Sequence, residues 1–222
     1  MTVPGDEART LALLDRLPEG LAAALVVRHA EREEIPPGTF GNDVPLTDRG
    51  RHAAYRLGEG LSHRPAGIVK TSPLPRCVQT AESIVAGSGW TADVIPDMLL
   101  GDPGPFVVDS ELAGSLILDI GIAGVVTQQL SATEPPDGMR STSEGVQLVL
   151  DSVAEALCAR CGTSVFVTHD AVLAVLVGTL YGRSVDKFRW PDYLDALVLW
   201  ADSDRIQFLW HGLDEGSYPI GS

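Results

Sequence analysis

The sequence alternates between short, continuous apolar runs and longer amphipathic stretches. An apolar run without polar alternation is typical of a strand covered by helices on both faces, whereas apolar residues three and four apart indicate a helix. Four such runs predict strands, at Ala23–Arg28, Gly67–Thr71, Ala92–Pro96 and Ser164–Thr168. Helices are predicted at Asp6–Leu17, after the N-cap Thr47, and at Cys77–Val85, Glu144–Cys161 and Ala171–Leu180. This alternation predicts an α/β fold, a three-layer sandwich with a mostly parallel central sheet flanked by helices.

The end of the sequence follows a different pattern. Ala196–Trp200 and Arg205–Trp210 are strand-like runs separated by the turn Asp202-Ser203-Asp204. A short polar turn between two such runs favours a β-hairpin. We therefore expect an antiparallel hairpin that closes one edge of the sheet.

The regular pattern is lost between the third strand and the helix that begins at Glu144. This stretch holds two possible helices around Leu112 to Leu130 and a polar segment from Thr133 to Ser143. Connections of this length are uncommon in compact domains and often act as lids or specificity elements. We predict a single domain over residues 1–222, with a lid or specificity insertion at about 97–143 over the active edge of the sheet.

The composition indicates one soluble domain. Of the 222 residues, 45% are hydrophobic, which is enough for one full core. The net charge of −14 has the wrong sign for nucleic acids and anionic membranes, so we expect neither as a partner. The opening Met1 to Arg16 does not resemble a signal peptide, and no apolar run reaches the ~20 residues that span a bilayer. The expected location is the cytoplasm.

The cysteines and acidic residues do not indicate a metal site. Cys158 and Cys161 have a C-x-x-C spacing, but no second pair exists, and two ordinary thiols at the end of a helix are the simpler interpretation. The sequence has no H-E-x-x-H motif, no P-loop and no aspartate cluster with ligand spacing, so we expect no metal and no cofactor. His52 and His63 are isolated histidines that we expect to be solvated, and Cys77 is expected to pack beneath the neighbouring arginine.

The first candidate for chemistry follows the first predicted strand. Arg28 and His29 end an apolar run, and Arg32 comes shortly afterwards. Nearby guanidinium groups disfavour the charged imidazole, and the neutral form is the nucleophile. Arginine forks also match phosphate oxygens in geometry. This pattern makes His29 a candidate nucleophile toward a phosphoryl group, although a surface Arg-His pair after a core strand would look the same.

Two further strands end in residues of the same kind. The second strand is followed by Ser72 to Arg76, and the fourth by His169 and Asp170. The carboxyl ends of parallel strands meet at one edge of a sheet, where ligands bind in open α/β folds, and the helix after Arg76 adds amide donors for an anion. We expect these residues to converge with His29, although Asp170 alone would also be explained as a helix N-cap.

Taken together, these segments resemble the histidine phosphatase superfamily, which includes the phosphoglycerate mutases and the histidine acid phosphatases. Arg28-His29-Ala30-Glu31-Arg32 resembles the signature R-H-G-x-R, with Ala30 in place of the usual glycine. The segment from Ser72 to Ala81 is similar to the second-arginine segment of the mutase-like branch, and Thr168-His169-Asp170 resembles the H-D of the acid-phosphatase branch. One departure from the acid-phosphatase signature is Glu34, which stands where that branch has proline.

The resemblance implies a phosphohistidine mechanism. His29, with its other ring nitrogen held by a backbone acceptor, would attack phosphorus. The phosphoryl oxygens would be held by Arg28, Arg32 and Arg76, with His169 as a further donor. A carboxylic acid would protonate the leaving oxygen and later activate water.

Two aspartates are candidates for this acid. Asp170 resembles the donor of the H-D branch and follows a strand that the sheet fixes in place. Asp102 lies where the mutase-like branch carries its glutamate, among glycines and prolines. The spacing supplied by Arg32 accompanies H-D in the acid-phosphatase branch, and this joint occurrence favours Asp170.

The expected activity is a metal-independent phosphatase that hydrolyses a small phosphomonoester. The insertion carries few cations beyond Arg140 and offers the apolar residues Phe106, Val107, Val108 and Met139, so we expect a substrate with an uncharged or apolar body. A mutase that moves the phosphoryl group within its substrate is one alternative, and a non-catalytic phosphate-binding regulator is another. The sequence predicts neither the metabolite nor the oligomeric state.

Overall fold

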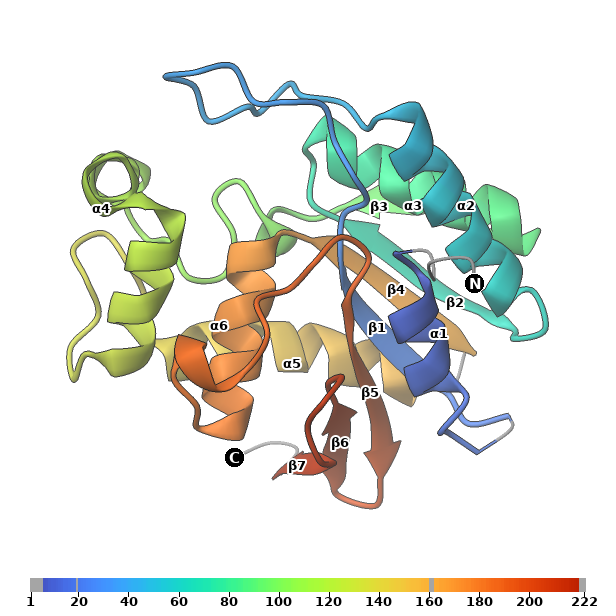
Figure 1. The fold of residues 1–222 in the computed structure, drawn as a ribbon. Coiled ribbons are helices and arrows are strands. Elements are labelled where there is room, and N and C mark those ends of the chain that lie inside the picture. The colour runs from blue at the N-terminus through green and yellow to red at the C-terminus, as the bar shows by residue number, and fades with distance from the viewer. Residues whose placement is uncertain (1–5, 19, 160–161, 220–222) are drawn as a thin grey trace.

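Figure 1 shows the computed structural model, which describes residues 6–18, 20–159 and 162–219. Seven strands in this part of the chain form one sheet in the order β3-β2-β4-β1-β5-β6-β7. The parallel half contains β1 (Ala23–Arg28), β2 (Ala66–Thr71), β3 (Val94–Pro96) and β4 (Thr163–Thr168). The antiparallel half contains β5 (Ala196–Asp202), β6 (Arg205–Leu209) and β7 (Gly216–Pro219).

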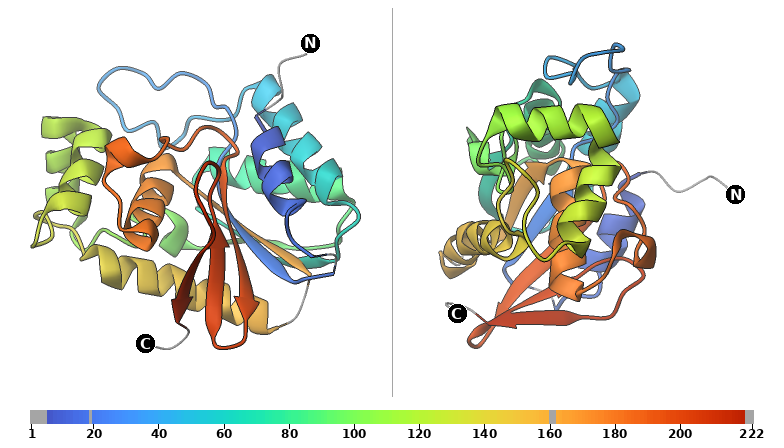
Figure 2. Two further views of the ribbon diagram at one scale, coloured as in Figure 1. Left: turned by 60° about the horizontal axis from the view of Figure 1, so that its bottom comes forward. Right: turned by 90° about the vertical axis from the view of Figure 1, so that its left-hand side faces the viewer.

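Helices cover both faces of this sheet (Figures 1 and 2). One face packs against α1 (Ala8–Leu14), α2 (Asp48–Leu61) and α3 (Pro75–Ser88). The other packs against α5 (Thr142–Cys158) and α6 (Asp170–Tyr181), with α4 (Ser110–Ser131) lying outside α6. The predicted three-layer α/β sandwich is therefore confirmed.

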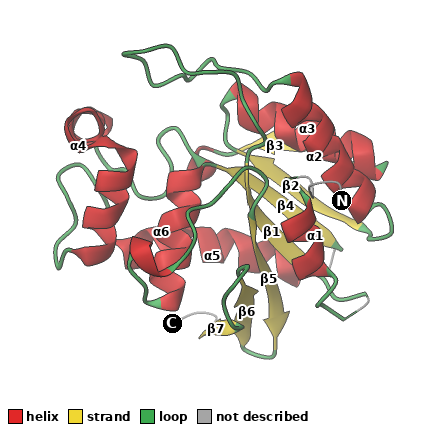
Figure 3. Cartoon of the chain, viewed as in Figure 1, coloured by secondary structure: helices red, strands yellow, loops and turns green. Residues whose placement is uncertain are grey.

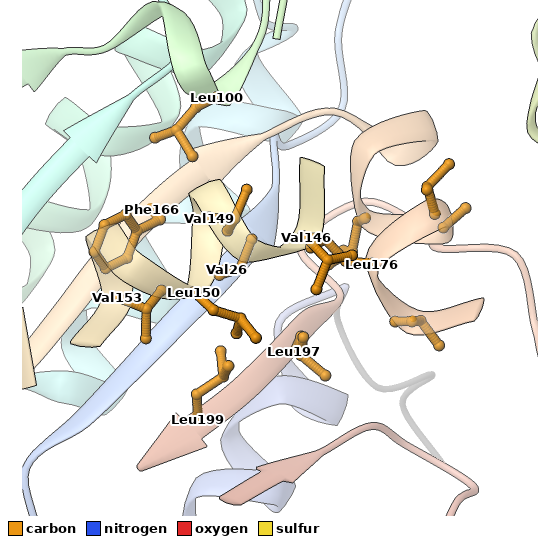
Figure 4. Close-up of a cluster of buried hydrophobic side chains, with 14 of the residues drawn as sticks. Val26, Leu100, Val146, Val149, Leu150, Val153, Phe166, Leu176, Leu197 and Leu199 are labelled. Atoms are coloured by element: carbon orange, nitrogen blue, oxygen red, sulfur yellow. The ribbon is translucent and has the colours of Figure 1, made fainter. Parts of the chain in front are cut away.

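The two cores explain why the strands read as continuous apolar runs. Leu25 and Val27 of β1 join the core beneath α2 and α3, whereas Val26 joins the core beneath α5 and α6. All three are fully buried, because both faces of β1 are covered. Figure 4 shows the second core, in which Val149 of α5 and Leu176 of α6 pack onto the sheet.

Most predicted elements are present with shifted ends. The first helix is shorter than predicted and stops at Leu14, and the chain then continues as a turn in which Leu17 is still buried. The third helix begins earlier, at Pro75, because proline is tolerated in the first helical turn. It ends at Ser88 and is followed by the C-cap Gly89, which adopts the left-handed conformation typical of that position. The predicted helix end at Cys161 lies outside the described residues.

The start of α6 excludes the alternative in which Asp170 is a helix N-cap. His169 occupies the N-cap position, so Asp170 is the first helical residue and not the cap. The carboxylate of Asp170 accepts a hydrogen bond from the backbone N–H of Ala171 at 2.9 Å and otherwise points to partners outside the helix. Helix capping therefore does not account for the presence of an aspartate at position 170.

The predicted hairpin is present, but it does not end the sheet. β5 extends to Asp202, which pairs with Arg205, so the turn consists of Ser203 and Asp204 only. A third antiparallel strand, β7, pairs with β6 and forms the edge. The sequence did not reveal β7, because a four-residue segment bounded by Gly216 and Pro219 has a weak strand pattern that suits only an edge.

The insertion contains the two helices expected around Leu112 to Leu130. They form one element, α4, that breaks at Gly121, where φ is 73° and ψ is 164°. With a mean hydropathy of 1.5 over its most apolar window, α4 is long and apolar enough to cross a membrane by length and composition alone. This corrects the expectation that no stretch reaches that length. Because the break divides the helix, neither arm has the ~20 continuous helical residues that span a bilayer.

Candidate active site

The parallel register of the sheet brings the two predicted histidines together. Arg28 of β1 pairs with Thr168 of β4, and the backbone N–H of His29 donates to the Thr168 carbonyl at 2.9 Å. His29 and His169 therefore leave the sheet side by side, with their ring centroids 5.5 Å apart. Arg76 reaches the same edge from the start of α3, and its Nη2 lies 3.4 Å from Nδ1 of His169.

His29 is buried and held in one tautomer. Only 3% of the residue is exposed, and Nδ1 lies 2.8 Å from the Ala30 carbonyl. Because a carbonyl can only accept, Nδ1 carries the proton and Nε2 has the lone pair. Nε2 has no hydrogen-bond partner among the described residues and is not fully buried. Burial lowers the pKa of His29 well below its usual range, and His169 lowers it further. The imidazole is thus a neutral base with one free nitrogen. Its other nitrogen is held by a backbone acceptor, as the family resemblance implies.

His169 is also neutral, but both of its ring nitrogens have partners. Nδ1 faces the guanidinium of Arg76, which can only donate, so the ring proton belongs on Nε2. Nε2 lies 2.9 Å from the hydroxyl oxygen of Ser72. Burial, followed by the charge of Arg76, lowers the pKa of His169 to about 3. The N–H that the sequence analysis assigned to the phosphoryl group is thus directed at Ser72 in this structure.

Arg76 is the buried cation of the site, with 7% of the residue exposed. Its Nη1 donates to the Gly41 carbonyl at 2.7 Å, which ties the guanidinium to the long loop between β1 and α2 (Figure 3). Its Nε is buried without a hydrogen-bond partner among the described residues. Burial lowers the pKa of Arg76, although an arginine remains charged at any working pH. Such a preorganised, incompletely satisfied cation is suited to an anionic ligand.

Cys77, the residue after Arg76, packs against His169. It is fully buried, and its Sγ lies 3.6 Å from Nε2 of His169. Burial raises the pKa of the Cys77 thiol to about 12, so the group stays protonated and unreactive. His52 and His63 are exposed on or after α2, as expected for solvated histidines.

Arg28 lies at the same edge but is largely occupied by protein partners. Its Nη2 pairs with the Asp170 carboxylate at 3.2 Å, and its Nη1 donates to the Pro191 carbonyl at 2.7 Å. The guanidinium also lies 4.3 Å from the centre of the Tyr193 ring. Trp190 donates from its indole to Asp170 at 3.3 Å. The pair of Arg28 and Asp170 is therefore one hydrogen-bonded unit that the segment 190–193 holds in place.

Arg32 is half-buried, like Arg28. Its Nη1 donates to the Glu33 carbonyl at 2.7 Å, at the start of the loop that follows β1. Arg32 is close enough for its charge to lower the pKa of Arg76. The sheet edge therefore brings together His29, His169 and Arg76 most closely, with Arg28 and Arg32 at its margins.

A cavity of about 380 Å³ opens beside these residues. Its polar end is lined by Arg76, His169 and Asp102. The rest of its wall is mostly apolar, and much of it comes from the insertion and α6: Pro105, Phe106, Val107, Ala113, Ile117, Ile122, Val125, Val126, Met139, Val172 and Val175. A volume of this size is typical of a small-molecule site. The cavity thus joins a cationic end to an apolar chamber.

The two candidate acids differ in their surroundings. Asp170 is bound by Arg28 and by Trp190, and neither Asp170 nor His29 is among the residues that line the cavity. Asp102 lines the cavity, is exposed, and has no hydrogen-bond partner among the described residues. It follows Gly101, which has a φ of 147° and lies so close to His169 that a Cβ atom there would be 2.5 Å from the ring. Only glycine fits this contact, which brings the Asp102 segment directly against the site.

Several residues of the site were not singled out by the sequence analysis. Trp190 and Tyr193 lie in a loop without a motif, and only the folded chain brings them to Arg28 and Asp170. Ser72 was quoted only as part of a segment, although its hydroxyl fixes His169. Gln129 lines the cavity from within an otherwise apolar helix face. Among the described residues, no group of three or more His, Cys, Asp or Glu side chains is arranged to hold a metal ion.

Comparisons with known proteins agree with this architecture. The model of the histidine phosphatase superfamily (branch 1) matches residues 24–100, which include His29 and Arg76. A comparison with curated proteins gave no match. A phosphoglycerate mutase from Bacillus anthracis is similar in structure, with a TM-score of 0.58 and 16% identity over 90% of this chain and 93% of that chain.

Two phosphatases are similar in structure as well. A mycobacterial glucosyl-3-phosphoglycerate phosphatase has a TM-score of 0.56 and 21% identity over 86% of this chain and 99% of that chain. The ecdysone phosphate phosphatase of Bombix mori has a TM-score of 0.53 and 17% identity over 81% of this chain and 89% of that chain. Identities this low establish a shared fold, and that fold occurs in both phosphatases and mutases.

Proposed function

The chain carries the matched segment and the fold of the histidine phosphatase superfamily, and on this premise we propose that it is a phosphatase that hydrolyses a small phosphomonoester through a phosphohistidine on His29. The observation that carries the proposal is the state of His29. Its Nδ1 is bound to the Ala30 carbonyl, its pKa is lowered by burial, and its Nε2 is unprotonated and unpartnered. A buried imidazole in this state is a nucleophile at neutral pH without an added base.

In the first step, Nε2 of His29 attacks phosphorus in line with the leaving oxygen. The P–N bond forms as the P–O bond breaks, and the leaving oxygen takes a proton from an acid. Arg76, with a buried Nε that has no partner among the described residues, stabilises the charge on the phosphoryl oxygens. Arg32 and Arg28 add positive charge from the margins of the site. Water then attacks phosphorus, the P–N bond breaks, and the same carboxylate accepts the proton of the water.

We assign the acid to Asp102, which reverses the order in which the sequence ranks the two aspartates. Asp102 lines the cavity that would hold the leaving group, has no hydrogen-bond partner among the described residues, and lies near enough for its charge to raise the pKa of Arg76. Asp170 is engaged with Arg28 and Trp190, and these contacts suit a side chain that positions the arginine. On this assignment Asp170 is a positioning residue.

The cavity supports a substrate with an uncharged or apolar body. Among its lining residues Arg76 is the only cation, and the chamber beyond it is formed largely by side chains of α4 and α6. A mutase acting on phosphoglycerate would have to hold a second anionic group of its substrate, and the described part of the cavity offers no second cation for it. The apolar wall therefore favours hydrolysis of a monophosphate over the mutase alternative.

The same proposal includes a metal-independent reaction in the cytoplasm, without a nucleic acid or membrane partner. These are expectations from the sequence, and a chelator tests the first of them. Treatment of the purified protein with a chelator should leave turnover of an aryl phosphate unchanged.

The direct test is release of inorganic phosphate from 4-nitrophenyl phosphate by the wild-type protein and His29→Ala. We expect His29→Ala to lose activity on the order of 10⁶-fold in kcat, as for other covalent nucleophiles. His52→Ala, which removes an exposed histidine of α2, is the matched control and should keep full activity. Activity retained by His29→Ala would exclude the mechanism, and an isomerised product without free phosphate would favour the mutase.

A further inference from the structure

Gln129 is a polar side chain without a structural explanation. It lies on α4, one helical turn after Val125 and Val126, and lines the same chamber as these two valines. Only 7% of the residue is exposed. Its Nε2 is fully buried and has no hydrogen-bond partner among the described residues, so this nitrogen meets a ligand in the cavity only when the side-chain amide turns. A carboxamide in an apolar wall is costly to leave unpaired, so its presence calls for a partner.

The position of Gln129 in the cavity indicates what this partner is. The phosphoryl end of the cavity is marked by Arg76 and His169, whereas Gln129 lies among the apolar side chains of α4 and α6. A group that meets Gln129 therefore belongs to the body of the ligand and not to its phosphate. The carboxamide can donate or accept, depending on how its oxygen and nitrogen are oriented. A hydroxyl group can also do both, and it satisfies either orientation.

We propose that Gln129 is a specificity residue that hydrogen-bonds a hydroxyl group on the otherwise apolar body of the substrate. This inference rests on the proposed function and narrows its substrate class to hydroxylated apolar phosphomonoesters. A site built to bind a buried hydroxyl discriminates strongly against the analogue that lacks it, because the polar group of the protein is then left unpaired.

The test uses a graded series of n-alkyl phosphates and the matching ω-hydroxyalkyl phosphates. For the wild-type protein, at the chain length that reaches Gln129, kcat/KM for the hydroxylated substrate should exceed that of its methyl-ended partner by about tenfold or more. Gln129→Leu should abolish or reverse this ratio. Gln128→Leu changes the neighbouring exposed glutamine of the same helix and should preserve it.

A stability measurement separates recognition from a structural role. If Gln129 serves the substrate, Gln129→Leu should be at least as stable to urea as the wild-type protein, because a buried unpaired amide is removed. A clear loss of stability in Gln129→Leu, greater than that in Gln128→Leu, would contradict the proposal. The proposal would also be contradicted if the wild-type protein showed no preference for the hydroxylated substrate at any chain length. The same holds if Gln129→Leu kept the preference of the wild-type protein.

Binding of non-hydrolysable phosphonates distinguishes this proposal from the function on which it rests. Calorimetry with alkyl and ω-hydroxyalkyl phosphonates reports the same preference without turnover. Preferential binding of the hydroxylated phosphonate by a protein that hydrolyses none of the phosphates would support Gln129 and overturn the phosphatase. Hydrolysis without any hydroxyl preference would support the phosphatase and overturn the role of Gln129.

Discussion

The sheet edge and the α4 insertion form the two ends of one cavity, and they are built in opposite ways. At the sheet edge, the two histidines follow β1 and β4, which pair with each other in parallel. His29 is buried, and the hydrogen bond from its Nδ1 to the Ala30 carbonyl fixes its tautomer. In α4, the helix is broken at Gly121, and Leu118 on its outer side is 72% exposed. Only 17% of its most apolar window is buried.

This difference separates chemistry from selectivity within one site. The backbone register of the sheet sets the spacing between His29 and His169. A substitution of a neighbouring side chain therefore leaves this spacing, and the reaction that depends on it, largely unchanged. The chamber wall of α4 is set by side chains such as Ile117 and Val126, each of which can be exchanged without altering the sheet. Changes at the sheet edge should therefore affect all substrates alike, and changes in α4 should depend on the substrate body.

The largest effect expected after loss of the nucleophile concerns the acid. Asp102→Asn should slow an alkyl phosphate, which needs a proton on its leaving oxygen, by roughly 10²- to 10⁴-fold. It should spare 4-nitrophenyl phosphate, whose leaving group needs none. Steady-state kinetics with both substrates measures this selectivity, and Asp137→Asn, an exposed change in the same insertion, is the control.

The assignment of Asp102 depends on the contrast with Asp170. Asp170→Asn should slow both substrates to a similar extent, since it frees Arg28 from its carboxylate partner. If Asp170→Asn alone shows the dependence on the leaving group, Asp170 is the acid, as the sequence favoured.

The next effect concerns Arg76. Arg76→Ala removes a buried donor to the phosphoryl oxygens and should lower kcat by roughly 10²- to 10³-fold for every phosphomonoester, whatever its body. Arg76→Lys should recover only part of this loss, because an ammonium lacks the planar fork. Arg51→Ala, on the exposed face of α2, should have no effect. A loss confined to substrates with large bodies would contradict the division between sheet edge and insertion.

A smaller effect is expected for the wall of the chamber. Ile117→Ala removes an apolar contact and should lower kcat/KM roughly tenfold for a long alkyl phosphate while leaving methyl phosphate unchanged. Leu118→Ala removes the adjacent exposed leucine and should change neither. An equal loss for both substrates in Ile117→Ala would show that α4 acts on the chemistry and not on selectivity.

The last prediction concerns stability and not turnover. His29 and His169 have pKa values lowered by burial, so the unfolded chain binds protons that the folded chain does not. Stability should therefore fall as the pH drops below ~6.5, by up to about 1.4 kcal/mol per pH unit for each histidine. Urea denaturation of His29→Asn should show a shallower dependence than that of wild type or His52→Asn. An unchanged dependence would show that His29 is not held neutral by the fold.

The residues of the site that can be predicted from the sequence differ from the others in how they are placed by the fold. The proximity of His29, Arg76 and His169 could be predicted because each follows a strand that reads as a short apolar run, and parallel strands place their ends at one edge. The partners of Arg28 could not be predicted, because Pro191 and Tyr193 lie more than 160 residues away in a loop without a pattern. Gln129 was missed because a glutamine within an apolar helix shows no chemistry until the cavity is known.

The most direct measurement of the central claim is the site of phosphorylation during turnover. The protein is mixed with a poor-turnover phosphomonoester, denatured at alkaline pH, where phosphohistidine persists, and digested for mass spectrometry. We predict one phosphoryl group on the peptide that contains His29, bound through Nε2, and none in His29→Ala. A phosphoryl group on another residue, or continued hydrolysis by His29→Ala without any phosphoprotein, would contradict the account.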